Sequence, residues 1–157
     1  MMAKILKVNK RSSLKSAIDL GIAMQLTNIS RDVVEDSENN RFYINENFED
    51  ITSTIYLADT FYENSFYSIK DIPMSFRFSI LVARRIYRKI GFKIINKKTM
   101  ESYKSSGKIY VSNIEKGLET FFSIFDLIRL SFMRKNDELI QHDHELINKE
   151  INLNERI

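Results

Sequence analysis

The scarcity of helix-breaking residues is the feature that most limits how this chain can fold. Its 157 residues include four glycines and one proline, Pro73. The turns of an all-β protein depend on both residue types, whereas long helices need neither. The composition therefore predicts an all-α fold. With 43% hydrophobic residues, the length suits one domain with its own core.

Apolar residues recur with helical spacing in four long segments, at about residues 14–37, 48–68, 73–95 and 110–133. In the first segment, the residues that share one side of a helical wheel are Ile18, Ile22, Leu26, Ile29 and Val33. Each segment is long enough for a helix that packs one face into a core. The pattern predicts a helical bundle.

Polar and turn-forming residues mark the ends of these predicted helices. Ser12 or Ser13 is the expected N-cap of the first, and the asparagine-rich run 37–41 should end it. Pro73 cannot continue the second helix but suits the first turn of the third. The polar run 96–98 should end the third helix.

The fourth segment is the most apolar, and we expect it to be buried. Its apolar residues are Val111, Ile114, Leu118, Phe121, Phe122, Phe125, Ile128 and Phe132. We therefore expect one structural unit over residues 1–133, followed by a polar tail over 134–157 with at most a short terminal helix. In that tail, His142 and His144 are interpreted as solvated side chains, because no third metal ligand accompanies them.

Charge and cysteine content exclude several classes of protein. The net charge of +3 arises from 24 basic and 21 acidic residues with no basic tract, so a nucleic-acid partner is not indicated. The absence of cysteine excludes disulfides and fits a reducing compartment, which makes the cytoplasm the expected location. No run of 18 apolar residues is present, although peripheral membrane contact through the basic third helix remains open.

Four side chains with oxygen donors form a stripe on the first predicted helix. Gln25, Asn28, Asp32 and Asp36 follow one another at intervals of 3, 4 and 4 residues, which places them on one narrow face. Amide and carboxylate oxygens are the hard ligands that suit Mg²⁺ bridging to phosphates, and Arg31 lies beside them. Two aspartates at this spacing, taken alone, are more often a solvated helix face.

The surrounding residues make the stripe more specific. The run from Asp19 to Asp32, followed by Glu35-Asp36 and Arg41-Phe-Tyr43-Ile, resembles the second aspartate-rich signature of the phytoene and squalene synthase family. A second block, Leu81-Val-Ala-Arg-Arg-Ile-Tyr87-Arg-Lys-Ile-Gly91, resembles a later helix of that family. The resemblance is strongest for bacterial phytoene synthases. It implies the C-terminal half of an isoprenoid-synthase-type helical bundle.

The resemblance also implies roles for individual residues. Asn28, Asp32 and Asp36 would form the metal site, with Mg²⁺ as the expected cofactor and Mn²⁺ as an alternative. Asp32 and Asp36 would be its catalytic acids. Gln25, Arg31 and Tyr87 would line the substrate pocket, although a tyrosine at the position of Tyr87 is as often part of a core.

The implied reaction is head-to-head prenyl transfer, in which two geranylgeranyl diphosphates condense to phytoene in carotenoid biosynthesis. The family's first aspartate-rich motif is absent, so we expect a truncated or split chain that needs an N-terminal complementary fragment or self-associates. Two alternatives stay open. One is a catalytically inactive remnant or helical interaction module, and the other is a squalene-type synthase that uses farnesyl diphosphate.

Overall fold

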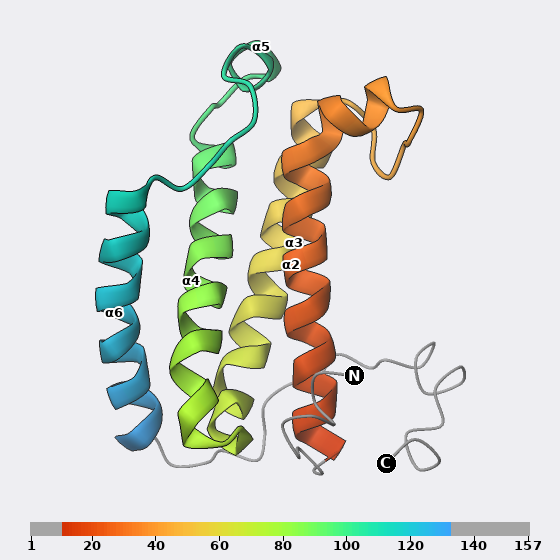
Figure 1. Ribbon diagram of the computed structural model, residues 1–157. Helices are drawn as coiled ribbons and strands as arrows, with labels where there is room; N and C mark the ends of the chain where they lie inside the picture. Colours follow the sequence, from red (N-terminus) through yellow and green to blue (C-terminus); the bar gives the residue numbers. More distant parts are fainter. Residues whose placement is uncertain (1–10, 133–157) are drawn as a thin grey trace.

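Four long helices form the body of the computed structural model, which describes residues 11–132 and leaves residues 1–10 and 133–157 undescribed. They are α2 (Arg11–Glu38), α3 (Phe48–Phe66), α4 (Met74–Ile95) and α6 (Asn113–Phe132). Successive long helices run in alternate directions, with α6 at one edge beside α4 (Figure 1). Two shorter elements are a 3₁₀ helix, η1 (Tyr67–Asp71), and α5 (Met100–Ser105). The described part contains no strand, which confirms the predicted all-α bundle.

The helix ends follow the predicted polar runs in most cases. Asn40 and Lys98, with φ of 56° and 64°, turn the chain after α2 and α4, as expected for the runs in which they lie. The Asn47 side chain accepts a hydrogen bond from the backbone N–H of Asp50 at 2.8 Å and so caps α3. The N-cap predicted at Ser12 or Ser13 is wrong, because α2 already includes both residues.

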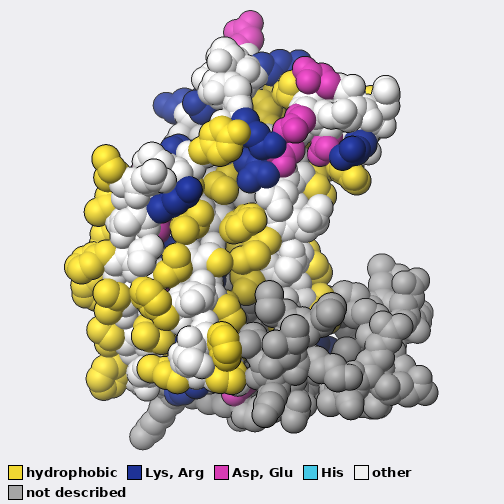
Figure 2. Space-filling view, viewed as in Figure 1, with side chains coloured by type: hydrophobic (Ala, Val, Ile, Leu, Met, Phe, Trp, Pro, Cys, Tyr) yellow, Lys and Arg dark blue, Asp and Glu magenta, His cyan; other side chains and the backbone are white. Residues whose placement is uncertain are grey.

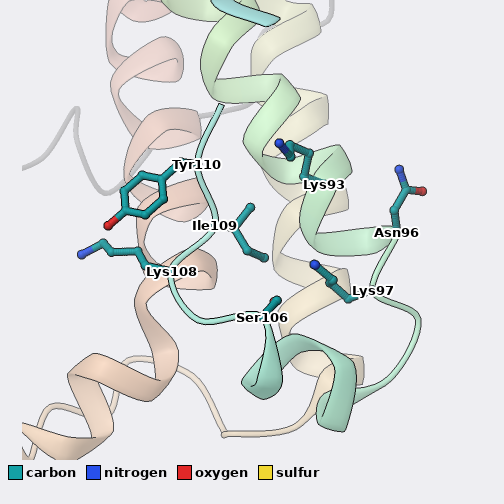
Figure 3. Close-up of a pocket in the computed structure, with 7 residues that line it drawn as sticks. All are labelled: Lys93, Asn96, Lys97, Ser106, Lys108, Ile109 and Tyr110. Carbon is teal, nitrogen blue, oxygen red and sulfur yellow. The ribbon is translucent and has the colours of Figure 1, made fainter. Parts of the chain in front are cut away.

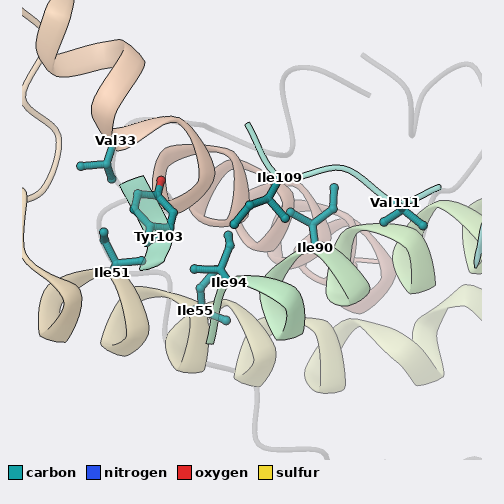
Figure 4. Packing of buried hydrophobic residues seen from close by; sticks show 8 residues of the cluster. All are labelled: Val33, Ile51, Ile55, Ile90, Ile94, Tyr103, Ile109 and Val111. Carbon is teal, nitrogen blue, oxygen red and sulfur yellow. The ribbon is translucent and has the colours of Figure 1, made fainter. Parts of the chain in front are cut away.

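The largest apolar cluster lies at the end of the bundle that also holds α5 (Figure 4). Side chains from α2, α3, α4 and α5 and from the segment after α5 pack together in this cluster. Its buried members are Val33, Ile51, Ile55, Ile90, Ile94, Tyr103, Ile109 and Val111. This cluster fixes the position of the C-terminal part of α2 relative to the loop that follows α5.

Polar contacts join the middle and the other end of the bundle. The hydroxyls of Thr27 on α2 and Tyr62 on α3 lie 3.1 Å apart and are both buried. Arg84 on α4 donates to the Tyr62 carbonyl at 3.0 Å, and its guanidinium lies 4.7 Å from the centre of the Phe66 ring. Burial lowers the pKa of Arg84 to about 10, so the side chain remains a cation at neutral pH.

The prediction that the fourth helix is buried is wrong for most of its apolar residues. Phe121, Phe125 and Ile128 are 55%, 55% and 47% exposed. The helix instead turns acidic side chains toward α4, where Glu119 and Asp126 lie 2.9 and 2.8 Å from Arg85. Apolar side chains cover the visible edge of the molecule along α6 (Figure 2). Ion pairs with Arg85 and the buried Leu130, which packs against Phe66 and Leu81, therefore hold this helix to the bundle, while most of its apolar face stays outside.

Some predictions concern residues outside 11–132. The short terminal helix, His142, His144 and the tail over 134–157 all lie outside the described residues. Within residues 11–132, no helix combines the length and the apolar content that crossing a membrane requires.

Candidate functional site

The predicted stripe lies on one uninterrupted helix. Gln25, Asn28, Asp32 and Asp36 all belong to α2, so their spacing places them along one face as expected. Gln25 is exposed, whereas the other three are half-buried at the end of the bundle that carries α5. The structure therefore keeps Asn28, Asp32 and Asp36 partly shielded from water and within reach of a ligand.

Asp32 is surrounded by two cations. Arg31 donates to both carboxylate oxygens of Asp32, at 2.8 and 2.7 Å. Lys108, from the loop after α5, places its Nζ 3.4 Å from Asp32 Oδ1 and 2.6 Å from Glu35 Oε2. Basic and acidic side chains gather at this end of the molecule (Figure 2). The structure thus brings predicted Arg31 and Asp32 together and adds Lys108, which the sequence did not indicate.

Arg31, Asp32 and Lys108 stabilise one another in their ionised forms. Burial alone would raise the pKa of the Asp32 carboxyl, but the hydrogen bonds and positive charges of Arg31 and Lys108 outweigh it and hold that pKa below its usual value. The hydrogen bond with Asp32 likewise raises the pKa of the Arg31 guanidinium, despite its burial. Hydrogen bonding to Glu35 and the charge of Asp32 raise the pKa of Lys108. All three groups are ionised at neutral pH.

The remaining oxygen donors differ in how they are engaged. The side-chain oxygen of Asn28 is buried and has no hydrogen-bond partner among the described residues. A buried acceptor in this state is costly unless a ligand satisfies it. Asp36 lies 3.8 Å from Arg41, a separation that leaves a loose ion pair.

The number and the placement of these oxygen donors decide whether they can form a Mg²⁺ site. The described residues hold no group of three or more His, Cys, Asp or Glu side chains arranged to bind a metal. The unsatisfied Asn28 oxygen and the carboxylates of Asp32 and Asp36 are the hard donors that Mg²⁺ takes. They fit one side of such a site, and a metal there would compete with Arg31 and Lys108 for Asp32.

Two tyrosines lie near the same guanidinium. Tyr87 on α4 and Tyr110 in the loop after α5 both contribute to the raised pKa of Arg31, after the larger contribution of Asp32. Tyr87 is half-buried and packs against the cluster that contains Ala23 and Tyr62. The structure packs Tyr87 against the core and within range of the Arg31 charge, and its role in a substrate pocket stays a prediction.

A buried tyrosine ties the loop that carries Lys108 to α2. The Tyr103 hydroxyl on α5 lies 2.9 Å from the Ser30 carbonyl and 2.7 Å from the Arg31 carbonyl, to which it donates. The ring points from α5 into the shared cluster, toward α2 (Figure 4). Burial and the nearby charge of Asp32 raise the pKa of Tyr103 to about 12, so the hydroxyl keeps its proton. This contact fixes α5 next to Arg31.

Tyr103→Phe is expected to lower the free energy of unfolding by about 1–2 kcal/mol, because the hydroxyl's hydrogen bond to the Arg31 carbonyl is lost while the ring stays packed. Urea denaturation measures the change. Tyr110→Phe is the matched control, since Tyr110 is 65% exposed and should change stability little. Equal effects of the two substitutions would show that the Tyr103 hydroxyl does not hold α5 in place.

A hollow of about 410 Å³ opens between the end of α4 and the loop after α5. Lys93, Lys97 and Lys108 contribute to its lining together with Ser106 and Tyr110 (Figure 3). Lys108 and Tyr110 extend toward α2 on one side, and Lys93 projects from α4 on the other side. Lys93 is paired with Glu115 at 2.9 Å. The hollow therefore continues a surface of basic side chains outward from Asp32, and two of them, Lys93 and Lys108, are paired with acidic residues of this chain.

A known protein family is similar to the part of the chain that carries the α2 stripe. Residues 1–48 match the family model described as squalene/phytoene synthase, a range that contains Gln25, Asn28, Arg31, Asp32 and Asp36. Tyr87 and Lys108 lie beyond that range. No solved structure gives a significant match to the chain.

The curated proteins that are similar to this chain are named as phytoene synthases. The chain is 33% identical over 116 residues to the 15-cis-phytoene synthase of Enterobacter agglomerans, covering 60% of this chain and 39% of that protein. It is 33% identical over 112 residues to the 15-cis-phytoene synthase of a Paracoccus species, covering 60% and 37%. For that of Pantoea ananas the identity is 30% over 115 residues, with the same coverage of 60% and 37%. The matches span less than two fifths of each relative.

Proposed function

We propose that this chain is a partial member of the squalene/phytoene synthase family and that it supplies the second aspartate-rich wall of a Mg²⁺-diphosphate site in a head-to-head prenyltransferase. The observation that carries the proposal is the α2 stripe, where a buried, unsatisfied Asn28 oxygen lies on the same face as Asp32 and Asp36. Phytoene is the proposed product, in line with the names of the relatives. Two geranylgeranyl diphosphates are the proposed substrates, as the family resemblance implies.

The residues of the stripe would share the work of holding a metal and a diphosphate. Asn28, Asp32 and Asp36 would ligate Mg²⁺, which when bound neutralises the diphosphate and stabilises it as a leaving group. Arg31 and Lys108 would then exchange Asp32 for phosphate oxygens, because a metal at Asp32 displaces them while they remain cations. Gln25 and Tyr87 would border the substrate next to these groups.

A single wall also explains the arrangement of charges. Asp32 is neutralised by Arg31 and Lys108, and the described residues provide no opposing carboxylates. A diphosphate-bound metal cluster is held most firmly between donors on two sides. We therefore propose that an N-terminal fragment with the family's first aspartate-rich motif completes the site, with the full reaction belonging to that assembly.

The test combines binding and turnover. Calorimetry with geranylgeranyl diphosphate should show binding by the chain that strengthens when Mg²⁺ is added. Mixing the chain with an N-terminal fragment of a phytoene synthase, Mg²⁺ and the same substrate should then yield phytoene. Farnesyl diphosphate in place of geranylgeranyl diphosphate distinguishes the squalene-type alternative. Mg²⁺-independent binding together with no hydrocarbon from either substrate would contradict the proposal.

Lys108→Ala is expected to weaken the binding of Mg²⁺-diphosphate by about tenfold, because the phosphate loses one charge-assisted contact. Lys116→Ala removes the same charge from the surface of α6 and is the control. Titration calorimetry with inorganic diphosphate and Mg²⁺ measures both. Equal affinities for the two variants would remove Lys108 from the proposed site.

A catalytically inactive helical module is the second candidate function. The observation that favours it is that Arg31 already engages both oxygens of Asp32, as in a structural ion pair. Such a module should retain its fold and show no effect of Mg²⁺ on diphosphate binding. The calorimetric comparison with and without Mg²⁺ separates the two candidates.

A further inference from the structure

The two sides of α6 have opposite character. Ser123 is fully buried and lies on the side that faces α4, where Glu119 and Asp126 pair with Arg85. Leu130 is buried on this side as well, and Leu127 packs beside it against the cluster of Phe66, Ile69 and Leu81. The other large apolar residues lie on the remaining surface of the helix and are between 43% and 84% exposed. They are Ile114, Leu118, Phe121, Phe122, Ile124, Phe125, Ile128 and Phe132, and we call them the α6 apolar face.

The spacing of the α6 apolar face is symmetric about Ser123. Every member has an apolar partner at the same number of residues on the other side of position 123, at one, two, five or nine residues. These partners are Phe122 with Ile124, Phe121 with Phe125, Leu118 with Ile128, and Ile114 with Phe132. At 100° per residue, Ser123 points directly away from the centre of this face.

We propose that the α6 apolar face binds the same face of a second copy of this chain, with the two α6 helices antiparallel. A two-fold axis opposite Ser123 sets each residue level with the residue at the equal and opposite offset in the other copy. Four members, at positions 114, 121, 125 and 132, lie within about 20° of the centre of the face and meet their partners directly. The other four flank them and cover the edges of the contact.

Charge does not oppose this pairing. The acidic side chains of α6 are paired with cations of α4 in their own chain, with Glu115 on Lys93 and Glu119 on Arg85. The Arg129 guanidinium lies 5.5 Å from the centre of the Phe66 ring in its own chain and is thus engaged beside the bundle. No two like charges face each other across the proposed contact.

The area of the face suits a modest dimer. A half-exposed phenylalanine offers roughly 100 Å² of apolar surface, so the eight residues offer on the order of 800 Å² per copy. If about three quarters of that surface is covered, two copies bury about 1,200 Å² together, which is the lower limit for specific, stable interfaces. We expect a dimer that forms at micromolar concentration. The contact does not involve the α2 stripe and is independent of the proposed function.

Sedimentation of the full chain at several concentrations tests the proposal. The wild-type chain should reach the mass of a dimer, and Phe121→Lys should raise the dissociation constant by about 30-fold or more, because it buries an ammonium against Phe125 of the second copy. Leu57→Lys is the control, since Leu57 is 49% exposed on α3, outside the α6 apolar face. Circular dichroism confirms that each variant remains folded.

A mixture of two variants tests the antiparallel register. Phe125→Glu alone should also give a monomer. Mixed with Phe121→Lys, it should restore dimers, because the ammonium of one copy then faces the carboxylate of the other while the remaining phenylalanines still pair. No recovery in the mixture, or equal loss with Leu57→Lys, would overturn the proposal.

Other occupants of the face would give different results. A wild-type chain that stays monomeric and sediments with phosphatidylcholine vesicles would assign the α6 apolar face to a lipid surface. A monomer that ignores vesicles and forms a one-to-one complex with an N-terminal fragment of a phytoene synthase would assign it to contacts within a larger fold. Either result overturns the pairing of two copies.

Discussion

Asp32→Asn is expected to reduce the affinity of the chain for Mg²⁺-diphosphate by about 100-fold, because the substitution removes the central carboxylate of the α2 stripe. The same substitution should leave Mg²⁺-free binding of inorganic diphosphate unchanged or increase it. Arg31 and Lys108 lose their shared counter-ion and are free to contact phosphate oxygens. If Asp32 is a metal ligand, the substitution therefore weakens diphosphate binding only when Mg²⁺ is present. If Asp32 only forms a structural ion pair, the substitution changes binding in the same way with and without Mg²⁺.

Calorimetry with inorganic diphosphate, with and without Mg²⁺, measures both effects. Asp59→Asn is a close control, because Arg88 donates to both oxygens of Asp59 at 2.7 and 3.0 Å, in the same geometry as Arg31 and Asp32. It should not change the effect of Mg²⁺. If Asp32→Asn and Asp59→Asn behave alike, Asp32 is one structural ion pair among several and the α2 stripe is not a metal wall.

The four long helices could be predicted from the sequence because their information is local. A helix needs an apolar face repeated every turn and polar residues that end it, and both can be recognised within about twenty residues. Asn40 adopts the left-handed conformation that the asparagine-rich run suggested. The α2 stripe was predictable for the same reason, since its members lie on a single helix.

Contacts between distant residues could not be predicted in this way. Lys108 meets Glu35 across 73 positions in the sequence, and Tyr103 reaches the Ser30 carbonyl across the same separation. The short α5 gave no signal, because six residues are too few for a periodic pattern. The one local hint was Thr99, whose side chain accepts from the N–H of Ser102 and caps this helix.

The fourth helix shows a different limit. Its periodicity correctly indicated an apolar face, but a pattern within one helix does not identify the element that covers that face. Arg85 and Lys93 on α4 pair with Glu119 and Glu115, and Leu130 is buried on the same side, so most of the other apolar residues lie outward. The partner of an amphipathic helix depends on the charges of its neighbours, which are distant in sequence.

Ile94→Ala is expected to lower the free energy of unfolding by about 3 kcal/mol, a large part of the roughly 5–15 kcal/mol that stabilises a typical domain. Ile94 is fully buried in the cluster that joins α2, α3, α4 and α5. Removing three carbons there leaves a void between helices that cannot all close around it. Urea denaturation followed by circular dichroism measures the loss.

Phe92→Ala removes a larger side chain two residues away on the same helix and serves as the control. Phe92 is 47% exposed, so its loss should cost much less than that of Ile94. Because Tyr103 belongs to the same cluster and donates to the Arg31 carbonyl, Ile94→Ala should also loosen the position of Lys108. Hydrogen exchange in residues 106–112 should therefore accelerate in Ile94→Ala and not in Phe92→Ala. Unchanged exchange in both would mean that the packing of the core and the position of the Lys108 loop are independent.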